Sequence, residues 1–167
     1  MLISQEQAAL AAKWWADQIS NAGSLKNHDN GGKDEANQWG MIFGSLLAHK
    51  NKPTVEQVEK FRSRLQEVLW LGGEHTFPAY EQITVCTGKD RKGTEKKIFP
   101  ERKVDLSRYV SHGLWTDYGP DTVLTACAEY AKINTSVFPI KTGMRFERDG
   151  RVMASLGYGS PWVEVKE

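Results

Sequence analysis

The sequence predicts an α+β fold in which an N-terminal three-helix segment packs on a small antiparallel sheet that carries one further helix. Apolar residues recur every three or four positions through most of the N-terminal part, which is the period of a helix. From Tyr80 onward the pattern alternates as it does in strands, and an Asp-Gly pair stands between two such stretches. We expect one domain over 1–167, with a helical part at 1–73 and an α+β part at 80–167.

The composition is that of an ordinary globular domain. Of 167 residues, 40% are apolar and 26% are charged, and the net charge is only +1. Six Trp, six Phe and five Tyr residues provide enough apolar surface to exclude a disordered chain. No apolar run approaches the ~20 residues of a spanning helix, and the N-terminus turns polar at Ser4, so we expect no membrane segment and no secretory signal. The expected location is the cytoplasm.

The first helix is predicted over residues 5–20. Ser4 and Gln7 have the spacing of a capping box, in which each side chain bonds the backbone N–H of the other residue. An apolar stripe follows at helical spacing, formed by Ala8, Ala12, Trp15 and Ile19.

Two more helices are predicted before the sheet. The second covers residues 34–49 and begins at Asp34. The third begins at Thr54, which forms a second capping box with Gln57, and it ends at Gly72-Gly73.

The predicted sheet begins with a strand at 80–86, and residues 94–99 can return antiparallel to it around a charged tip at 88–93. Residues 88–104 carry seven basic and three acidic side chains, a net charge of +4. Such residues prevent an exposed strand edge from pairing with other chains, and they also suit a contact with nucleic acid or an acidic partner. The basic hairpin residues are Lys89, Arg91, Lys92, Lys96 and Lys97.

A short strand is predicted at 105–110 and a loop at 111–120. A helix follows, with Pro120 in its first turn and the carboxylate of Asp121 at the positive end of its dipole.

A β-hairpin closes the chain. Its predicted strands cover 144–148 and 151–156, and Asp149-Gly150 between them favours a two-residue type I′ turn. Residues 162–165 are expected to add a last strand.

Catalytic and metal-binding patterns are weak. Cys86 and Cys127 are expected to be reduced thiols, and no His or Cys has a second one at metal-ligand spacing, so we expect no metal and no cofactor. Cys86 with His112 and either Asp105 or Asp117 has the residue types of a thiol nucleophile and its base. A small enzyme using Cys86 and His112 is therefore one alternative, although the sequence favours a protein without catalysis.

Polar and aromatic side chains gather at three junctions, at 117–121, 141–142 and 157–159, and glycines flank the tyrosines of the first and the third. If the sheet brings them together, they form either a partner interface or a pocket in which rings stack on a base and Lys141 meets a phosphate. Alternatively the rings cover the hydrophobic core. The candidate binding residues are Trp115, Asp117, Tyr118, Asp121, Lys141, Thr142 and Tyr158.

The last third of the chain carries the pattern DYGP at 117–120, FPxKTxM at 138–144 and GYG at 157–159. This pattern resembles small uncharacterised accessory proteins of bacteriophages and prophages. The resemblance implies a protein that acts in the host cytoplasm as an inhibitor or adaptor of host machinery, anti-defence proteins such as anti-CRISPRs included. It implies no catalytic residue.

The sequence therefore predicts a non-catalytic protein that binds and modulates a host protein or nucleoprotein complex. The chain lacks the phosphate-binding, metalloprotease and nucleophile-elbow motifs. A small-ligand or nucleotide binder, acting as a sponge through Tyr118, Tyr158 and Lys141, is the main alternative.

Overall fold

The computed structural model describes residues 3–22, 50–78, 80–86, 92–98 and 101–167. It is a mixed helix and sheet structure with antiparallel sheets. The chain divides into two compact units, one of residues 1–73 with 106–167 and one of residues 74–105. The predicted helix at 34–49 lies outside the described residues. Among the described residues, no helix combines the length and the apolar character needed to cross a bilayer.

Two long helices begin as the sequence predicts. Helix α1 (Gln5–Ser20) and helix α3 (Val55–Leu71) both start with a complete capping box. Each capping-box glutamine also binds a distant part of the chain, because its amide nitrogen is left over after its oxygen has capped the helix. Nε2 of Gln7 donates to the carbonyl of Glu147 at 3.1 Å, and Nε2 of Gln57 donates to the carbonyl of Lys132 at 2.6 Å.

The helices of the first unit pack around aromatic residues. Helix α3 packs against both α1 and α5 (Thr122–Ala131). The rings of Trp15 and Phe61, both fully buried, lie 6.1 and 5.7 Å from the ring of Phe138. This cluster joins α1, α3 and the chain that leaves the short 3-10 helix η2 (Thr135–Val137).

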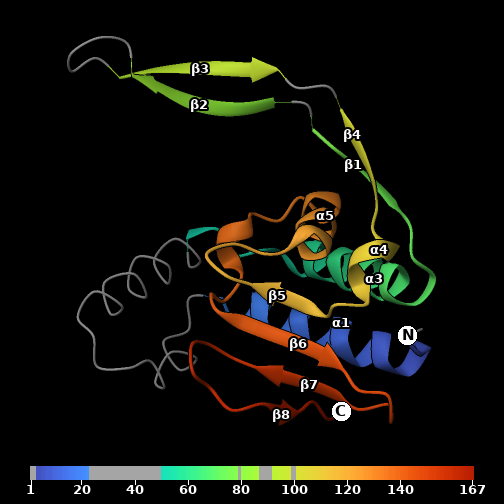
Figure 1. Cartoon of the computed structure of the whole chain (residues 1–167). Coiled ribbons are helices and arrows are strands. Elements are labelled where there is room, and N and C mark those ends of the chain that lie inside the picture. The colour runs from blue at the N-terminus through green and yellow to red at the C-terminus, as the bar shows by residue number, and fades with distance from the viewer. Residues whose placement is uncertain (1–2, 23–49, 79, 87–91, 99–100) are drawn as a thin grey trace. The chain divides into compact units, whose positions relative to one another are not determined.

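The four-stranded antiparallel sheet of this unit has the order β5-β6-β7-β8 (Figure 1). Its strands are β5 (Leu114–Thr116), β6 (Thr142–Phe146), β7 (Val152–Ser155) and β8 (Val163–Glu164). One face carries the register partners Leu114, Met144 and Ala154, which are all buried. Helices α1 and α5 both pack against the sheet. The other face carries Trp115, Gly143 and Ser155 in register.

The hairpin of β6 and β7 is confirmed, but its predicted turn is wrong. The Glu147 N–H donates to the carbonyl of Arg151, and the Gly150 N–H donates to the carbonyl of Glu147, so three residues form the loop. Gly150 has φ +93°, whereas Asp149 does not have the positive φ that a type I′ turn requires. The Asp149 carboxylate accepts from the Arg151 N–H, which stabilises a type I turn followed by the glycine.

The stretch between the two units differs from the prediction. The expected strand at 105–110 is wrong, because β4 is Arg102–Asp105 and the next residues form the short helix α4 (Ser107–Val110). Leu106 is fully buried, and its N–H donates to the carbonyl of Gly73, which turns the chain there. The predicted loop at 111–120 contains β5.

The second unit consists of two antiparallel strand pairs. Strand β1 (Glu74–Phe77), which the sequence did not indicate, pairs with β4 from Glu74↔Asp105 to Phe77↔Arg102. Strand β2 (Tyr80–Cys86) pairs with β3 (Lys92–Ile98), which confirms the predicted hairpin. Of the basic hairpin residues, β3 contains Lys92, Lys96 and Lys97, whereas Lys89 and Arg91 lie outside the described residues.

Candidate functional site

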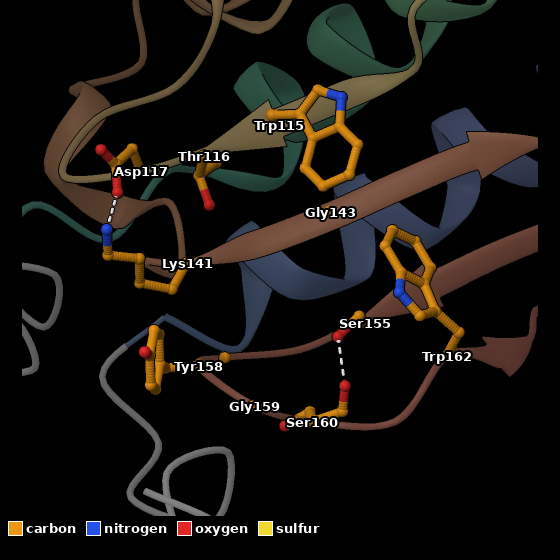
Figure 2. Close-up of a pocket in the computed structure, with 11 residues that line it drawn as sticks. Trp115, Thr116, Asp117, Lys141, Gly143, Ser155, Tyr158, Gly159, Ser160 and Trp162 are labelled. Carbon is orange, nitrogen blue, oxygen red and sulfur yellow. Dashed lines mark hydrogen bonds and ion pairs between the residues drawn. The ribbon is translucent and has the colours of Figure 1, made fainter.

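The three junctions singled out in the sequence meet at one cleft of about 510 Å³ on the outer face of the four-stranded sheet. Asp117, Lys141 and Tyr158 contribute to its lining, one from each junction (Figure 2). Trp115 and Trp162 line it as well. We call this hollow the aromatic cleft.

Two buried threonines hold the junctions together. The Thr116 hydroxyl accepts from the Thr142 N–H at 3.0 Å and donates to the carbonyl of Pro139. The Thr142 hydroxyl accepts from the Gly157 N–H at 3.2 Å. The sequence placed Thr142 on the binding surface, and this is wrong: its side chain is 1% exposed because these hydrogen bonds use it inside the fold.

Asp117 and Lys141 form an ion pair at one end of the cleft. The Lys141 N–H donates to the Asp117 carbonyl at 3.1 Å, while the Lys141 ammonium donates to the Asp117 carboxylate. Lys141 has a left-handed backbone with φ +53°, and its ammonium lies 4.5 Å from the centre of the Tyr118 ring. The hydrogen bond to Asp117 raises the pKa of Lys141, so this ammonium stays charged at neutral pH.

Both tyrosines of the predicted surface point away from the core. Tyr118 is 85% exposed and Tyr158 is 75% exposed, so the alternative that these rings cover the core does not apply to them. Exposed tyrosine rings of this kind are enriched where proteins bind partners.

The other end of the cleft is formed by an edge-to-face pair of indoles. The ring centres of Trp115 and Trp162 are 5.6 Å apart, and the Arg145 guanidinium lies 4.6 Å from the centre of the Trp162 ring. Gly143 lies beneath the two indoles in Figure 2. A Cβ at Gly143 would lie 2.5 Å from the Trp115 ring and 3.0 Å from the Trp162 ring, so only glycine admits both rings here.

Most polar groups of the cleft floor and walls are already used within the protein. The Ser155 hydroxyl donates to the Ser160 carbonyl at 2.8 Å, and the Ser160 hydroxyl donates to the Leu156 carbonyl. The Trp115 indole N–H donates to the His112 carbonyl at 3.0 Å. The cleft therefore offers exposed rings with few uncommitted hydrogen-bonding groups.

Asp121 is not part of the cleft lining. It is the N-cap of α5, and its carboxylate accepts from the Leu124 N–H at 2.9 Å and from the Trp115 N–H at 2.7 Å. Burial raises the pKa of this carboxyl, and the two hydrogen bonds oppose the rise. In the structure this carboxylate joins the start of α5 to β5, and its predicted part in binding stays a prediction. Pro120 precedes the N-cap instead of lying in the first helical turn.

The two cysteines of the chain belong to different units. Cys127 is fully buried, and burial raises the pKa of its thiol to about 12, so it holds no thiolate at neutral pH. Cys86 and His112 belong to different units, and their pairing stays a prediction. Within the described residues, no three His, Cys, Asp or Glu side chains gather as metal ligands would.

Trp162, Arg145 and Gly143 were missed by the sequence reasoning. Gly143 and Trp162 reach the cleft, and Arg145 reaches the Trp162 ring, through cross-strand register and through the chain that follows GYG, neither of which a local pattern reveals. Trp162 at the start of the last expected strand, shortly after GYG, was the one available indication in the sequence.

Comparison of the chain with protein-family models, with curated proteins and with solved structures finds no match. The resemblance to bacteriophage accessory proteins therefore stays a prediction.

Proposed function

We propose that this chain is a non-catalytic binding protein that engages a partner protein through the aromatic cleft. The observation that supports the proposal is that exposed Tyr158 and Trp115 line one hollow with a fixed cation, Lys141. The Lys141 ammonium also lies 4.5 Å from the centre of the exposed Tyr118 ring, which stands beside the cleft. Tyr, Trp and cationic side chains dominate the energy of protein interfaces when they surround a pocket that water leaves on binding.

The charges around the cleft favour a protein over a nucleic acid. Lys141 pairs with Asp117, and Arg145 pairs with Glu147 at 2.8 Å, so each cation is already neutralised locally. Binding of a phosphate backbone depends on cations whose counterions can be released. Nucleic-acid binding through the basic hairpin is a separate prediction, and a binding constant that falls steeply with salt would indicate it.

The same pairing disfavours the nucleotide sponge. A phosphate at Lys141 would compete with the Asp117 carboxylate and would lie next to its negative charge. An uncharged partner that stacks on the rings neither competes with the Asp117 carboxylate for Lys141 nor is repelled by its negative charge. In the setting that the phage resemblance implies, that partner would be a host protein or nucleoprotein complex.

Site-specific photo-crosslinking tests the proposal. A photoreactive phenylalanine derivative placed at Tyr158 should give a discrete crosslinked host protein, because this ring stands 75% exposed beside the cleft. The same residue at Tyr130, which is 58% exposed on α5 and lines another surface, is the matched control.

Crosslinks at Tyr158 that are absent at Tyr130 and are lost in a Tyr118→Ala background support the function. Equal labelling from both positions, or none from Tyr158, contradicts it.

A further inference from the structure

We propose that the occupant of the aromatic cleft is a proline-rich segment of the partner in the polyproline II conformation. This inference rests on the binding function proposed above. It is argued from the hydrogen-bonding character of the cleft, from its rings and from its charge.

The uncommitted polar groups of the cleft are able to donate. Within the part of the chain that the structure describes, the Tyr158 hydroxyl and the Trp162 indole N–H of the lining make no hydrogen bond, and neither does the Tyr118 hydroxyl beside the cleft. Figure 2 shows the Trp162 nitrogen on the side of the ring that faces Ser155. The charged acceptor in the lining, the Asp117 carboxylate, already accepts from the Lys141 ammonium through Oδ1.

A proline-rich segment matches such a wall. Proline has a carbonyl that accepts hydrogen bonds and no backbone N–H that donates them. A proline-rich segment can therefore accept from the donors of the cleft and leaves no proline backbone donor unpaired. The carbonyls of a polyproline II helix point outward and make no internal hydrogen bonds, so they are free to accept from tyrosine and tryptophan. A sugar or a nucleobase brings several donors, and the committed Ser155 and Ser160 hydroxyls of the floor are poorly placed to satisfy them.

The rings are arranged for flat apolar groups. Tyr158 stands on the side of the ion pair, and Trp115 and Trp162 stand at the other end of the cleft, on either side of Gly143 (Figure 2). The Tyr118 ring lies beside the cleft, against the Lys141 ammonium. Aromatic-lined grooves of this kind dock proline rings, and the segment loses little entropy because it is already ordered.

The charge of the cleft agrees with an uncharged occupant. Lys141 and Arg145 are each paired with a carboxylate, and each lies over an aromatic ring. These internal pairs fix the rings without leaving a net charge that an anionic or cationic ligand would have to neutralise.

Fluorescence anisotropy of labelled decaproline, added to the full chain, tests the inference. We expect saturable binding to the wild-type protein and none of a Gly-Ser decapeptide with the same label. Tyr158→Ala and Tyr118→Ala should each weaken decaproline binding by about tenfold or more, a loss of one buried ring contact. Tyr130→Ala, which removes another exposed tyrosine ring elsewhere on the surface, should leave binding unchanged.

Three outcomes overturn the inference. These are the absence of saturable decaproline binding at millimolar concentration, binding that the Tyr158 variant retains, and binding of a ten-residue oligothymidine in preference to decaproline. If decaproline fails while the Tyr158 crosslink persists, the occupant proposed here is wrong and the binding function stands. If both fail, the cleft is not a protein-binding site. Circular dichroism of each variant separates loss of binding from loss of fold.

Discussion

The two faces of the four-stranded sheet use adjacent residues of the same strands for opposite purposes. Leu114, Met144 and Ala154 lie side by side on the inner face and are each at most 1% exposed. Their neighbours along the strands, Trp115 and Gly143, form the outer face and the floor of the cleft. The inner face carries apolar side chains that pack tightly in the core. The outer face instead places tryptophan, the largest residue, next to glycine, the smallest. A surface that served folding alone would have no need of that combination.

The largest difference between the faces should appear in stability. Met144→Ala removes a fully buried side chain from the inner face and should lower the free energy of unfolding by about 2–5 kcal/mol. Urea denaturation measures this change. Tyr158→Ala on the outer side should stay within about 0.5 kcal/mol of the wild type, because most of its ring is already in water. Similar losses for both variants would mean that the two faces do not differ in this way.

A smaller effect is expected at Gly143, which belongs to the outer face and yet allows no added atom. Gly143→Ala should displace both indoles and cost about 1–3 kcal/mol, as overpacking does. The near-ultraviolet circular dichroism of the Trp115–Trp162 pair should weaken together with decaproline binding. An unchanged indole signal would show that the rings do not depend on the glycine floor.

The smallest effect concerns Asp121, which joins β5 to α5. Its pKa is raised in the folded state, so the folded protein holds the proton more tightly than the unfolded chain does. The wild type should therefore lose stability relative to Asp121→Asn as the pH rises from the unfolded pKa of ~3.9 through the folded value. Asparagine is a matched control because it also caps helices well. Parallel stability curves for the two proteins over this range would contradict the raised pKa.

Local patterns were sufficient for the features whose partners lie close in sequence. Both capping boxes, and the hairpin between β6 and β7, depend on residues three to twelve positions apart. Strand β1 escaped prediction because its four residues pair with a strand that begins 25 residues after Phe77, and no short-range signal marks it. The turn at Gly150 was mistaken for type I′ because Asp149 can cap its own turn in the right-handed region.

For the candidate site as well, local patterns indicated some residues correctly and could not decide the placement of others. The sequence indicated Asp117, Tyr118, Lys141 and Tyr158 because glycine and proline mark their junctions, and the structure places all four together. It could not separate these from Asp121 and Thr142, whose side chains are drawn inward by backbone N–H groups of segments up to 15 residues away. Whether a polar side chain faces water or a backbone donor depends on tertiary contacts, which composition does not encode.

The two capping glutamines have a consequence for how the chain comes apart. Gln7 starts α1 and holds a residue 140 positions away, while Gln57 starts α3 and holds one 75 positions away. Fraying at either helix terminus therefore releases a remote loop in the same step, and detachment of that loop exposes the helix start to fraying. Hydrogen exchange at the first turns of α1 and α3 would consequently report openings that span most of the chain, not local breathing.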